Sequence, residues 1–392
     1  MSKIEKLIKV LCPNGVEYKK IDELCIFQNG FAFKSNLFKS TGEIILRITN
    51  LDGKKISLED VKYFSLSDYS DLQSYLVKDN DIVIAMSGAT TGKIGINNTG
   101  KKLYLNQRVG KITPRGKNLN NKYLYHLLLS KSEYFYKLAG GGAQPNLSSE
   151  AIKNTILPVP PLEVQEEIVR ILDKFGELEA ELEAELEARK SQYEFWREKL
   201  VKEGQLTEIS KVFKRLKGTK ITAGRMQEIA KNDGNVKVFA GGQTRVNVDE
   251  AEIPFQNIIN VPSVIVQSRG LIDFIYYDKL FTFKNEMWAY TCDNPVTVKY
   301  LYYSLKSNVN HFRSIGKQMG SMPQISLPIT EKYKINIPSL QEQGRIVNIL
   351  DKFDKLVNDI SEGLPAEIEA RRKQYEYYRN KLLSFEELVV ND

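Results

Sequence analysis

Glycine-rich stretches of this 392-residue sequence carry basic and amide side chains at short spacings. Arg108 directly follows Gln107, and Arg245 comes two residues after a glutamine, as Arg269 does. Arginine and lysine can bind phosphate groups or guanine, and asparagine and glutamine can bind adenine. The candidate DNA-binding residues on these stretches are Thr90, Thr91, Lys93, Gln107, Arg108, Gln144, Asn146, Gln243, Thr244, Arg245, Gln267, Ser268, Arg269, Lys317 and Gln318. Taken alone, each cluster is more typical of a loop that bonds its own backbone than of a base reader.

Residues suited to catalysis or metal binding do not recur as a set. Residues 88–93 resemble a phosphate-binding P-loop, but three residues instead of four separate the glycines, and Ile94 stands where that loop has its magnesium-binding serine or threonine. The two histidines and three cysteines include no Cys-x-x-Cys pair, which is too few ligands for zinc or iron. We therefore expect no catalytic residue, metal or cofactor in this chain.

The net charge of +7 is unevenly distributed along the sequence. Residues 1–158 carry +9 and residues 204–335 carry +7, whereas residues 159–203 carry −6 and residues 336–392 carry −3. This alternation is expected if the long segments contact a polyanion and the short ones do not. A mildly basic solvated surface is the alternative.

The composition is that of a globular protein. Hydrophobic residues make up 42% of the sequence, and no apolar run approaches the roughly 18 residues that a membrane-spanning helix needs. The first residues lack the apolar stretch of a secretory signal, so we expect a cytoplasmic protein.

The sequence contains an internal duplication. Residues 160–175 match residues 338–353 at an offset of 178, and residues 188–200 match residues 370–382 at an offset of 182. Shorter matches lie upstream, including Pro145-Asn146-Leu147-Ser148 with Pro323-Gln324-Ile325-Ser326. The chain is therefore two copies of one unit, each a basic globular part followed by an acidic helical part. Residues 204–300 cannot be aligned with residues 1–123.

Apolar side chains recur every three or four residues between positions 161 and 204 and predict one long helix, about 60 Å at 1.5 Å per residue. A helix of this length needs a packing partner, which the second copy supplies. There, Gly363-Leu364-Pro365 predicts a break between a short helix and a longer one. The residues expected to pack between the helices are Leu178, Leu182, Leu186, Tyr193, Trp196, Leu200, Tyr375, Tyr378 and Leu382. Their aromatic members suit a base-stacking platform too, but helical spacing in an acidic segment favours packing.

The globular parts are predicted to be rich in strands. Residues 43–48, 81–86, 263–267 and 274–277 are short runs of β-branched or aromatic residues bounded by turn formers. A helix near 122–138, mirrored near 299–315, is expected to close each unit. The predicted fold class is α+β.

These segments, in this order and duplicated, resemble the specificity subunit of type I restriction-modification systems over essentially the whole chain. The residues that carry the resemblance are 161–168, 171–175, 338–353, 370–379, 142–148 and 262–270. The resemblance implies that residues 1–158 and 204–335 are target recognition domains, each reading one half of a split, asymmetric DNA target. It implies that residues 159–203 and 336–392 pair as an antiparallel coiled coil, which acts as a spacer and docks other subunits.

The same resemblance implies the partners. Two methylation subunits would bind S-adenosylmethionine and modify adenine, and restriction subunits would use ATP and magnesium. Recognition domains vary within the family, so the base-reading residues are not implied by it. A two-domain coiled-coil scaffold that binds other proteins is the alternative, and it predicts no salt-dependent DNA binding. An enzyme with an unrecognised site would be active as the pure chain.

The long helix contains three tandem four-residue units, at positions 177–180, 181–184 and 185–188. Each unit adds about 6 Å and turns the leucine stripe by about 40°. In the resembled family, changes in such a repeat alter the unspecified spacer of the DNA target. We therefore expect this segment to act as a ruler, beyond presenting a solvated acidic face.

Overall fold

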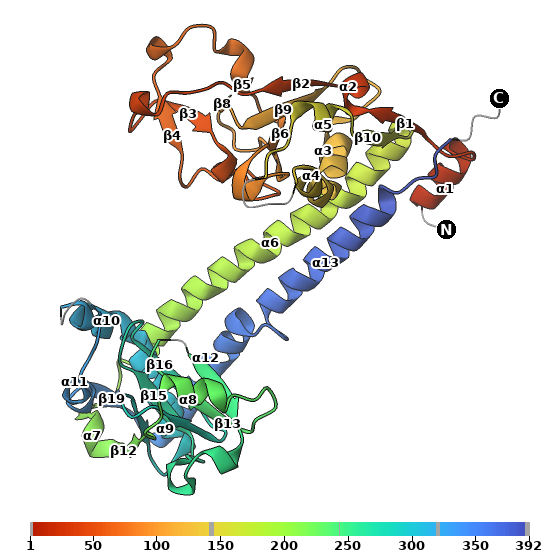
Figure 1. Ribbon diagram of the computed structural model, residues 1–392. Coiled ribbons are helices and arrows are strands. Elements are labelled where there is room, and N and C mark those ends of the chain that lie inside the picture. Colours follow the sequence, from red (N-terminus) through yellow and green to blue (C-terminus); the bar gives the residue numbers. More distant parts are fainter. Residues whose placement is uncertain (1–2, 141–144, 243, 319–321, 389–392) are drawn as a thin grey trace. The chain divides into compact units, whose positions relative to one another are not determined.

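The computed structural model describes residues 3–140, 145–242, 244–318 and 322–388 (Figure 1). The chain forms two compact units. Unit 1 consists of residues 1–181 and 369–392, and unit 2 of residues 182–368. The boundary between the units falls within two helices, α6 (Leu162–Leu200) and α13 (Leu364–Leu382), so each unit contains part of both.

Unit 1 combines small sheets with helices. Its other helices are α1 (Lys3–Leu11), α2 (Ile21–Leu24), α3 (Asn121–Ser130), α4 (Ser132–Leu138) and α5 (Ser149–Lys153). Its strands are β1 (Glu17–Lys20), β2 (Cys25–Asn29), β3 (Glu43–Leu46), β4 (Lys62–Phe64), β5 (Leu76–Val77), β6 (Ile82–Ala85), β7 (Ile94–Ile96), β8 (Leu103–Leu105), β9 (Val109–Pro114) and β10 (Ile156–Val159). Within the described residues the strands form sheets in the orders β2-β9-β6-β7, β4-β3-β8-β5 and β1-β10.

Unit 2 repeats this plan. Its other helices are α7 (Ile209–Val212), α8 (Ala223–Glu228), α9 (Pro295–Ser307), α10 (Val309–Lys317), α11 (Leu327–Glu331) and α12 (Leu340–Asn358). Its strands are β11 (Gln205–Glu208), β12 (Lys214–Lys217), β13 (Val236–Phe239), β14 (Arg245–Val248), β15 (Ser263–Gln267), β16 (Asp273–Tyr277), β17 (Phe281–Phe283), β18 (Trp288–Thr291) and β19 (Lys334–Ile337). In the described part of the unit, the sheets have the orders β12-β18-β15-β16, β14-β13-β17 and β11-β19.

In each unit, one central strand leads into a loop that contains candidate DNA-binding residues. Strand β6 lies between β9 and β7, and β15 lies between β18 and β16. Every residue of both strands is buried, as the sequences Ile-Val-Ile-Ala and Ser-Val-Ile-Val-Gln suggest for strands covered on both faces. Each strand leads directly into a turn that contains candidate residues. A rigid strand therefore fixes where each turn begins.

A helix that follows the strands joins each sheet to the long helices. In unit 1, Leu124 and Leu128 of α3 belong to one buried cluster with Ile84 of β6 and Ile168 of α6. In unit 2, Leu301 and Leu305 of α9 pack in a cluster with Val264 of β15. One core cluster of each unit thus lies between its central strand and a helix.

The helix expectations are partly confirmed. α6 is one continuous helix of 39 residues, as expected. The break in the second copy is confirmed, but α12 and α13 both have 19 residues, so the expectation of a short helix followed by a longer one is wrong. Gly363 packs tightly against the end of α12. A Cβ at this position would lie 2.5 Å from the Lys355 carbonyl oxygen, so only glycine fits at the break. Pro365 is the second residue of α13.

The helix expected to close each unit is interrupted once. The segments near 122–138 and 299–315 are each two helices and not one, with Lys131 and Asn308 at the joins. Both joining residues have φ near −100° and ψ near 10°, outside helical geometry.

The four strands expected from sequence are confirmed as β3, β6, β15 and β16.

The helices of unit 1 pair in opposite directions. The ring of Phe175 on α6 stacks on Tyr378 of α13 at 5.4 Å, and Glu179 further along α6 contacts Arg372, which lies earlier on α13, at 2.6 Å. Rising numbers on one helix therefore meet falling numbers on the other, which confirms antiparallel pairing there.

Over the residues that the structure describes, no helix is long and apolar enough to cross a bilayer.

Candidate nucleic-acid interface

Three segments far apart in sequence form one loop cluster in unit 1. Loop cluster 1 consists of residues 86–93, 106–108 and 145–147. The Met86 amide donates to the Arg108 carbonyl over 2.9 Å, and the Leu147 amide donates to the Met86 carbonyl over 2.7 Å. The Gly88 amide donates to the Pro145 carbonyl over 3.2 Å. The turn after β6 is thus bonded by its backbone to both other segments.

Loop cluster 1 exposes three of the predicted DNA-binding side chains. Gln107, Arg108 and Asn146 are exposed, and Arg108 Nη1 donates to Asn146 Oδ1 over 3.3 Å. A guanidinium has five N–H donors, so this bond leaves the fork of Arg108 able to bind a further acceptor. Arginine and asparagine, brought together from separate segments, form a surface suited to phosphates or base edges.

Three other candidates in unit 1 hold the turn in place or lie half-buried beside it. Thr91 is only 4% exposed, and its hydroxyl donates to the Gly88 carbonyl over 2.7 Å. The half-buried Thr90 donates to the Ile48 carbonyl over 3.0 Å. Lys93 is half-buried at the end of the turn.

Unit 2 contains a corresponding cluster. Loop cluster 2 consists of residues 240–242, 244–245, 268–271, 284–286, 316–318 and 323–325. The Ile325 amide donates to the Ser268 carbonyl over 2.9 Å, and the Gly270 amide donates to the Pro323 carbonyl over 2.9 Å. The Ala240 amide donates to the Thr244 carbonyl over 3.0 Å.

The candidates in loop cluster 2 also divide by exposure. Gln267 and Ser268 are 3% exposed, and their side chains bond to the backbone carbonyls of Leu271 and Glu286. The exposed candidates are Thr244, Arg245, Arg269, Lys317 and Gln318. The Arg245 guanidinium lies 5.6 Å from the centre of the Phe239 ring. Gln144 and Gln243 lie outside the described residues.

The two loop clusters share one backbone pattern, and the sequence alignment detects only the part of it at residues 145–148 and 323–326. Gly88 and Gly270 both have positive φ, +75° and +70°, which glycine adopts without strain. Each donates its amide to a proline carbonyl, that of Pro145 or Pro323. Single β-bridges pair Ser87 with Asn146 in unit 1 and Arg269 with Gln324 in unit 2.

This pattern identifies two residues that sequence reasoning missed. Ser87 corresponds to Arg269, and Gln324 corresponds to Asn146. A signal for Gln324 was present, because the short match at 145–148 and 323–326 already aligns it with Asn146. No such match exists for Ser87.

A buried polar junction fixes the recognition part of unit 1 to its helices. His126 of α3 is 4% exposed, and its Nε2 lies 3.0 Å from Asp173 Oδ1 of α6. Its Nδ1 lies 3.2 Å from the hydroxyl of Tyr375 on α13. Lys122 Nζ contacts the other Asp173 oxygen at 2.6 Å. His126 is therefore a structural residue that joins three helices.

Two carboxyl groups on α6 are stabilised as anions in unit 1. Burial raises the pKa of Asp173, but hydrogen bonds from His126 and Lys122 outweigh burial and lower it. The pKa of Glu179 is lowered in the same way, because bonds from Arg372 and Lys54 outweigh its burial. Both groups stabilise unit 1 above the ordinary carboxyl pKa of about 4, and this stabilisation is lost as the pH falls through the lower folded values.

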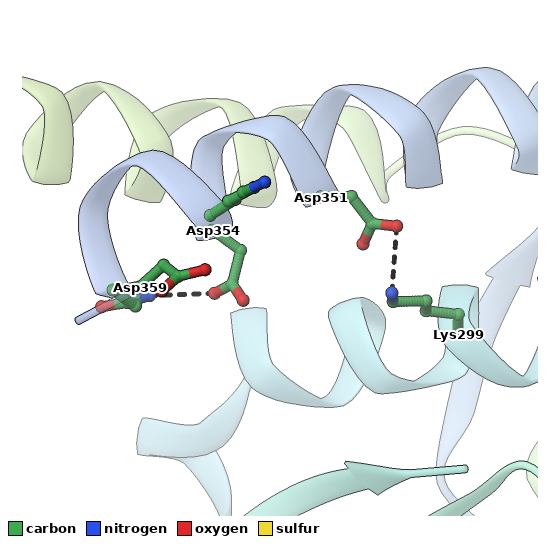
Figure 2. A pocket seen from close by; sticks show the side chains of 6 residues that line it. Lys299, Asp351, Asp354 and Asp359 are labelled. Atoms are coloured by element: carbon green, nitrogen blue, oxygen red, sulfur yellow. Dashed lines mark hydrogen bonds and ion pairs between the residues drawn. The ribbon is translucent and has the colours of Figure 1, made fainter. Parts of the chain in front are cut away.

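The junction of unit 2 is built with different side chains. Lys299 of α9 contacts Asp351 of α12 at 3.0 Å, and Figure 2 shows the two side chains facing each other. The Tyr303 hydroxyl also donates to Asp351, and the Tyr193 hydroxyl of α6 donates to Asp354 over 3.1 Å. An open pocket here is lined by Lys299, Asp351, Asp354, Lys355, Asn358 and Asp359 (Figure 2). The described residues contain no group of three or more His, Cys, Asp or Glu side chains arranged for a metal ion.

The predicted helix-packing residues differ in their surroundings. Tyr193 and Tyr375 are buried, at 5% and 6% exposure. Leu186 and Leu200 are half-buried against the core of unit 2, and Leu382 against that of unit 1. Tyr378, stacked on Phe175, is half-buried, as are Leu178 and Leu182. Trp196 is half-buried too, with its ring edge-on to Phe195 and the Lys199 ammonium 5.2 Å from its centre.

Comparisons with known proteins agree on one family. Residues 13–188 and 198–370 each match the profile of the type I restriction modification DNA specificity domain. The chain is 30% identical to a putative type I restriction enzyme specificity subunit of Haemophilus influenzae, over 97% of this chain and 98% of that protein. It is 35% identical to the EcoR124I/EcoR124II specificity subunit of Escherichia coli, over 67% of this chain and 70% of that protein.

A solved structure has the same fold. The S subunit of a type I restriction-modification system from M. genitalium superposes with a TM-score of 0.57 at 17% identity, over 94% of this chain and 96% of that one. Two family domains, a full-length relative and a shared fold lead to one conclusion: the chain belongs to the family of type I restriction-modification specificity subunits.

Proposed function

We propose that this chain selects the DNA target of a type I restriction-modification complex by reading two unlike half-sites, one with each loop cluster. In this family the specificity subunit is non-catalytic, and catalysis lies in the modification and restriction subunits. One observation carries the proposal. The two clusters share their backbone bonding but present different exposed side chains, Arg108 with Asn146 in unit 1 and Arg269 with Lys317 in unit 2.

The finer assignments follow the predicted organisation. Residues 1–158 and 204–335 are proposed as the two recognition domains, and residues 159–203 and 336–392 as the spacer and the docking surface for two modification subunits. Restriction subunits complete the complex. S-adenosylmethionine, ATP and magnesium are assigned to the partner subunits. The acidic charge of both helical regions supports a role away from the phosphates of DNA.

Exposure divides the candidate residues by role. Gln107, Arg108, Asn146, Thr244, Arg245, Arg269, Lys317 and Gln318 are exposed and are proposed to contact DNA. The buried Thr91, Gln267 and Ser268 bond to backbone carbonyls, so we assign them the role of holding the loops in shape. Rigid loops place the exposed side chains in one geometry, which lowers the entropy lost on binding.

Alanine variants of three arginines test this proposal in the assembled complex. If Arg108, Arg245 or Arg269 binds a guanine, its replacement should cost about 1 to 3 kcal/mol and relax one position of its own half-site. If it binds a phosphate, the variant should weaken binding to all sequences and reduce the salt slope by about one. Competition binding at several salt concentrations measures both properties.

Arg225→Ala is the matched control, because Arg225 is an exposed arginine on α8 paired with Glu252 and lies outside both loop clusters. It should change neither base preference nor salt slope. If all three loop variants behaved like this control, the assignment of the loop clusters to DNA would be wrong.

A further inference from the structure

The turn before β9 and the turn before β18 are the same structural element in the two units. The Val109 amide donates to the Asn106 carbonyl over 2.8 Å, and the Met287 amide donates to the Lys284 carbonyl over 2.9 Å. Both turns therefore close in the same way, and β9 begins at Val109 whereas β18 begins at Trp288, one residue after Met287.

Contacts to the neighbouring strands confirm this correspondence. The Asn106 amide donates to Leu46 at the end of β3, over 3.1 Å. The Lys284 amide donates to Phe239 at the end of β13, over 2.9 Å. A parallel β-bridge pairs Phe31 with Asn106, and another pairs Thr219 with Lys284. Residues 106–108 thus correspond to residues 284–286.

The register of the central strands gives the same alignment. Ile84 of β6 lies opposite Gly110 of β9, and Val266 of β15 lies opposite Trp288 of β18. Two residues before these partners come Arg108 and Glu286. The corresponding turns therefore end on side chains of opposite charge.

The Glu286 side chain belongs to loop cluster 2. It is 25% exposed, with Oε1 3.0 Å from Lys284 Nζ. The same carboxylate oxygen lies 4.0 Å from where a Cβ of Gly241 would be, so the carboxylate lies beside Gly241, four residues before Arg245. The backbone carbonyl of Glu286 accepts the bond from buried Ser268, which fixes the turn next to Arg269.

A carboxylate at this position is unfavourable beside phosphates and favourable beside only some base edges. In the major groove, cytosine offers an amino donor that a carboxylate accepts, whereas guanine offers two acceptors that a guanidinium binds. Adenine offers a donor next to the N7 acceptor, whose lone pair would face the carboxylate. The salt bridge from Lys284 reduces repulsion between Glu286 and the DNA backbone.

We infer that Glu286 determines specificity in the second half-site by accepting a hydrogen bond from the amino group of a cytosine, and that Arg108 reads a guanine at the corresponding position of the first half-site. This inference rests on the proposed function, since it takes the loop clusters to contact DNA. It also explains how one duplicated scaffold reads two different half-sites. The turn is kept, and the charge at its last residue is reversed.

Charge-swap variants test the inference in the assembled complex. Selection from DNA pools with one half-site randomised should show that Glu286→Arg changes one position of the second half-site from cytosine to guanine and leaves the first half-site unchanged. Arg108→Glu should make the reverse change in the first half-site only. Glu286→Gln keeps the size of the side chain and should reduce discrimination at the same position by roughly 5- to 150-fold, which is about 1 to 3 kcal/mol.

Two controls separate the outcomes. Lys284→Ala removes the ion pair and should keep the cytosine preference, and Glu228→Arg makes the same charge change on α8, outside the loop clusters, and should alter no base preference. If Glu286→Gln and Glu286→Arg kept every base preference and changed only overall affinity, Glu286 would be a counter-ion of Lys284 and the inference would fail. The proposed function would fail separately if the unaltered complex showed no preference for a two-part site. If Glu286→Arg does not fold, Glu286→Gln decides the question.

Discussion

Replacing Tyr375 by alanine should lower the free energy of unfolding of unit 1 by about 3 to 5 kcal/mol, the usual cost of removing a buried aromatic side chain. The ring is 6% exposed and belongs to the main core cluster of the unit. The substitution also removes the hydroxyl that lies 3.2 Å from His126 Nδ1, which leaves a buried polar atom without that partner. Thermal unfolding of the chain should show a transition about 10 °C lower or more.

The neighbouring tyrosine supplies the matched control. Tyr377 is on the same helix but 61% exposed, so Tyr377→Ala should change the free energy of unfolding by no more than about 0.5 kcal/mol. Tyr375→Phe keeps the ring and removes only the hydroxyl, at an expected cost of about 1 to 3 kcal/mol. Equal melting temperatures for Tyr375→Ala and Tyr377→Ala would contradict the assignment of Tyr375 to a buried helix junction.

Deleting residues 181–184 should shorten the unspecified spacer of the DNA target by one or two base pairs and leave both half-sites unchanged. Four residues of helix correspond to about 6 Å and about 40°. One base pair rises about 3.4 Å and turns by about one tenth of the helical repeat. Affinity for the original target should fall toward that for non-specific DNA, a loss on the order of 10³-fold or more.

The contacts on either side of the deletion explain why the helix should tolerate it. Glu179, before the deleted residues, contacts Arg372 and Lys54 at 2.6 and 3.0 Å. Tyr193, after them, stacks on Phe353 and bonds to Asp354. These contacts lie within unit 1 and unit 2 respectively, and the deletion removes none of their residues.

A variant of unchanged length is the control for the deletion. Glu181→Gln combined with Glu183→Gln removes two charges from the repeat without shifting the helix, so it should keep the original spacer. Mapping of methylated bases after modification by each complex gives the result. An unchanged spacer in the deletion variant, or a new half-site sequence, would show that the repeat is not a ruler.

The helical regions were predictable because their duplication survives in the sequence. Matching segments at offsets of 178 and 182 located the long helix and the four additional residues of the second copy. The lengths of α12 and α13 were not predictable from Gly363-Leu364-Pro365 alone. The break follows residue 358, and closing it depends on tight packing of Gly363 against carbonyls of the preceding helix.

The loop clusters were only partly predictable. Polar side chains on glycine-rich turns bond to backbone as readily as to ligands, so Gln267 and Arg269 look equally suitable in sequence although only Arg269 is exposed. Glu286 was missed because a search for DNA-binding residues favours cations and amides. Its correspondence with Arg108 depends on backbone hydrogen bonds, which persist while the side chains diverge.

Two units of one duplicated scaffold are proposed to read two unlike half-sites of DNA. This reading of two half-sites is tested most directly by mapping the methylated bases in DNA modified by a complex of this chain with its modification subunits. The predicted result is a motif with two different specified parts separated by unspecified base pairs. A single contiguous motif, or a perfect inverted repeat, would contradict it.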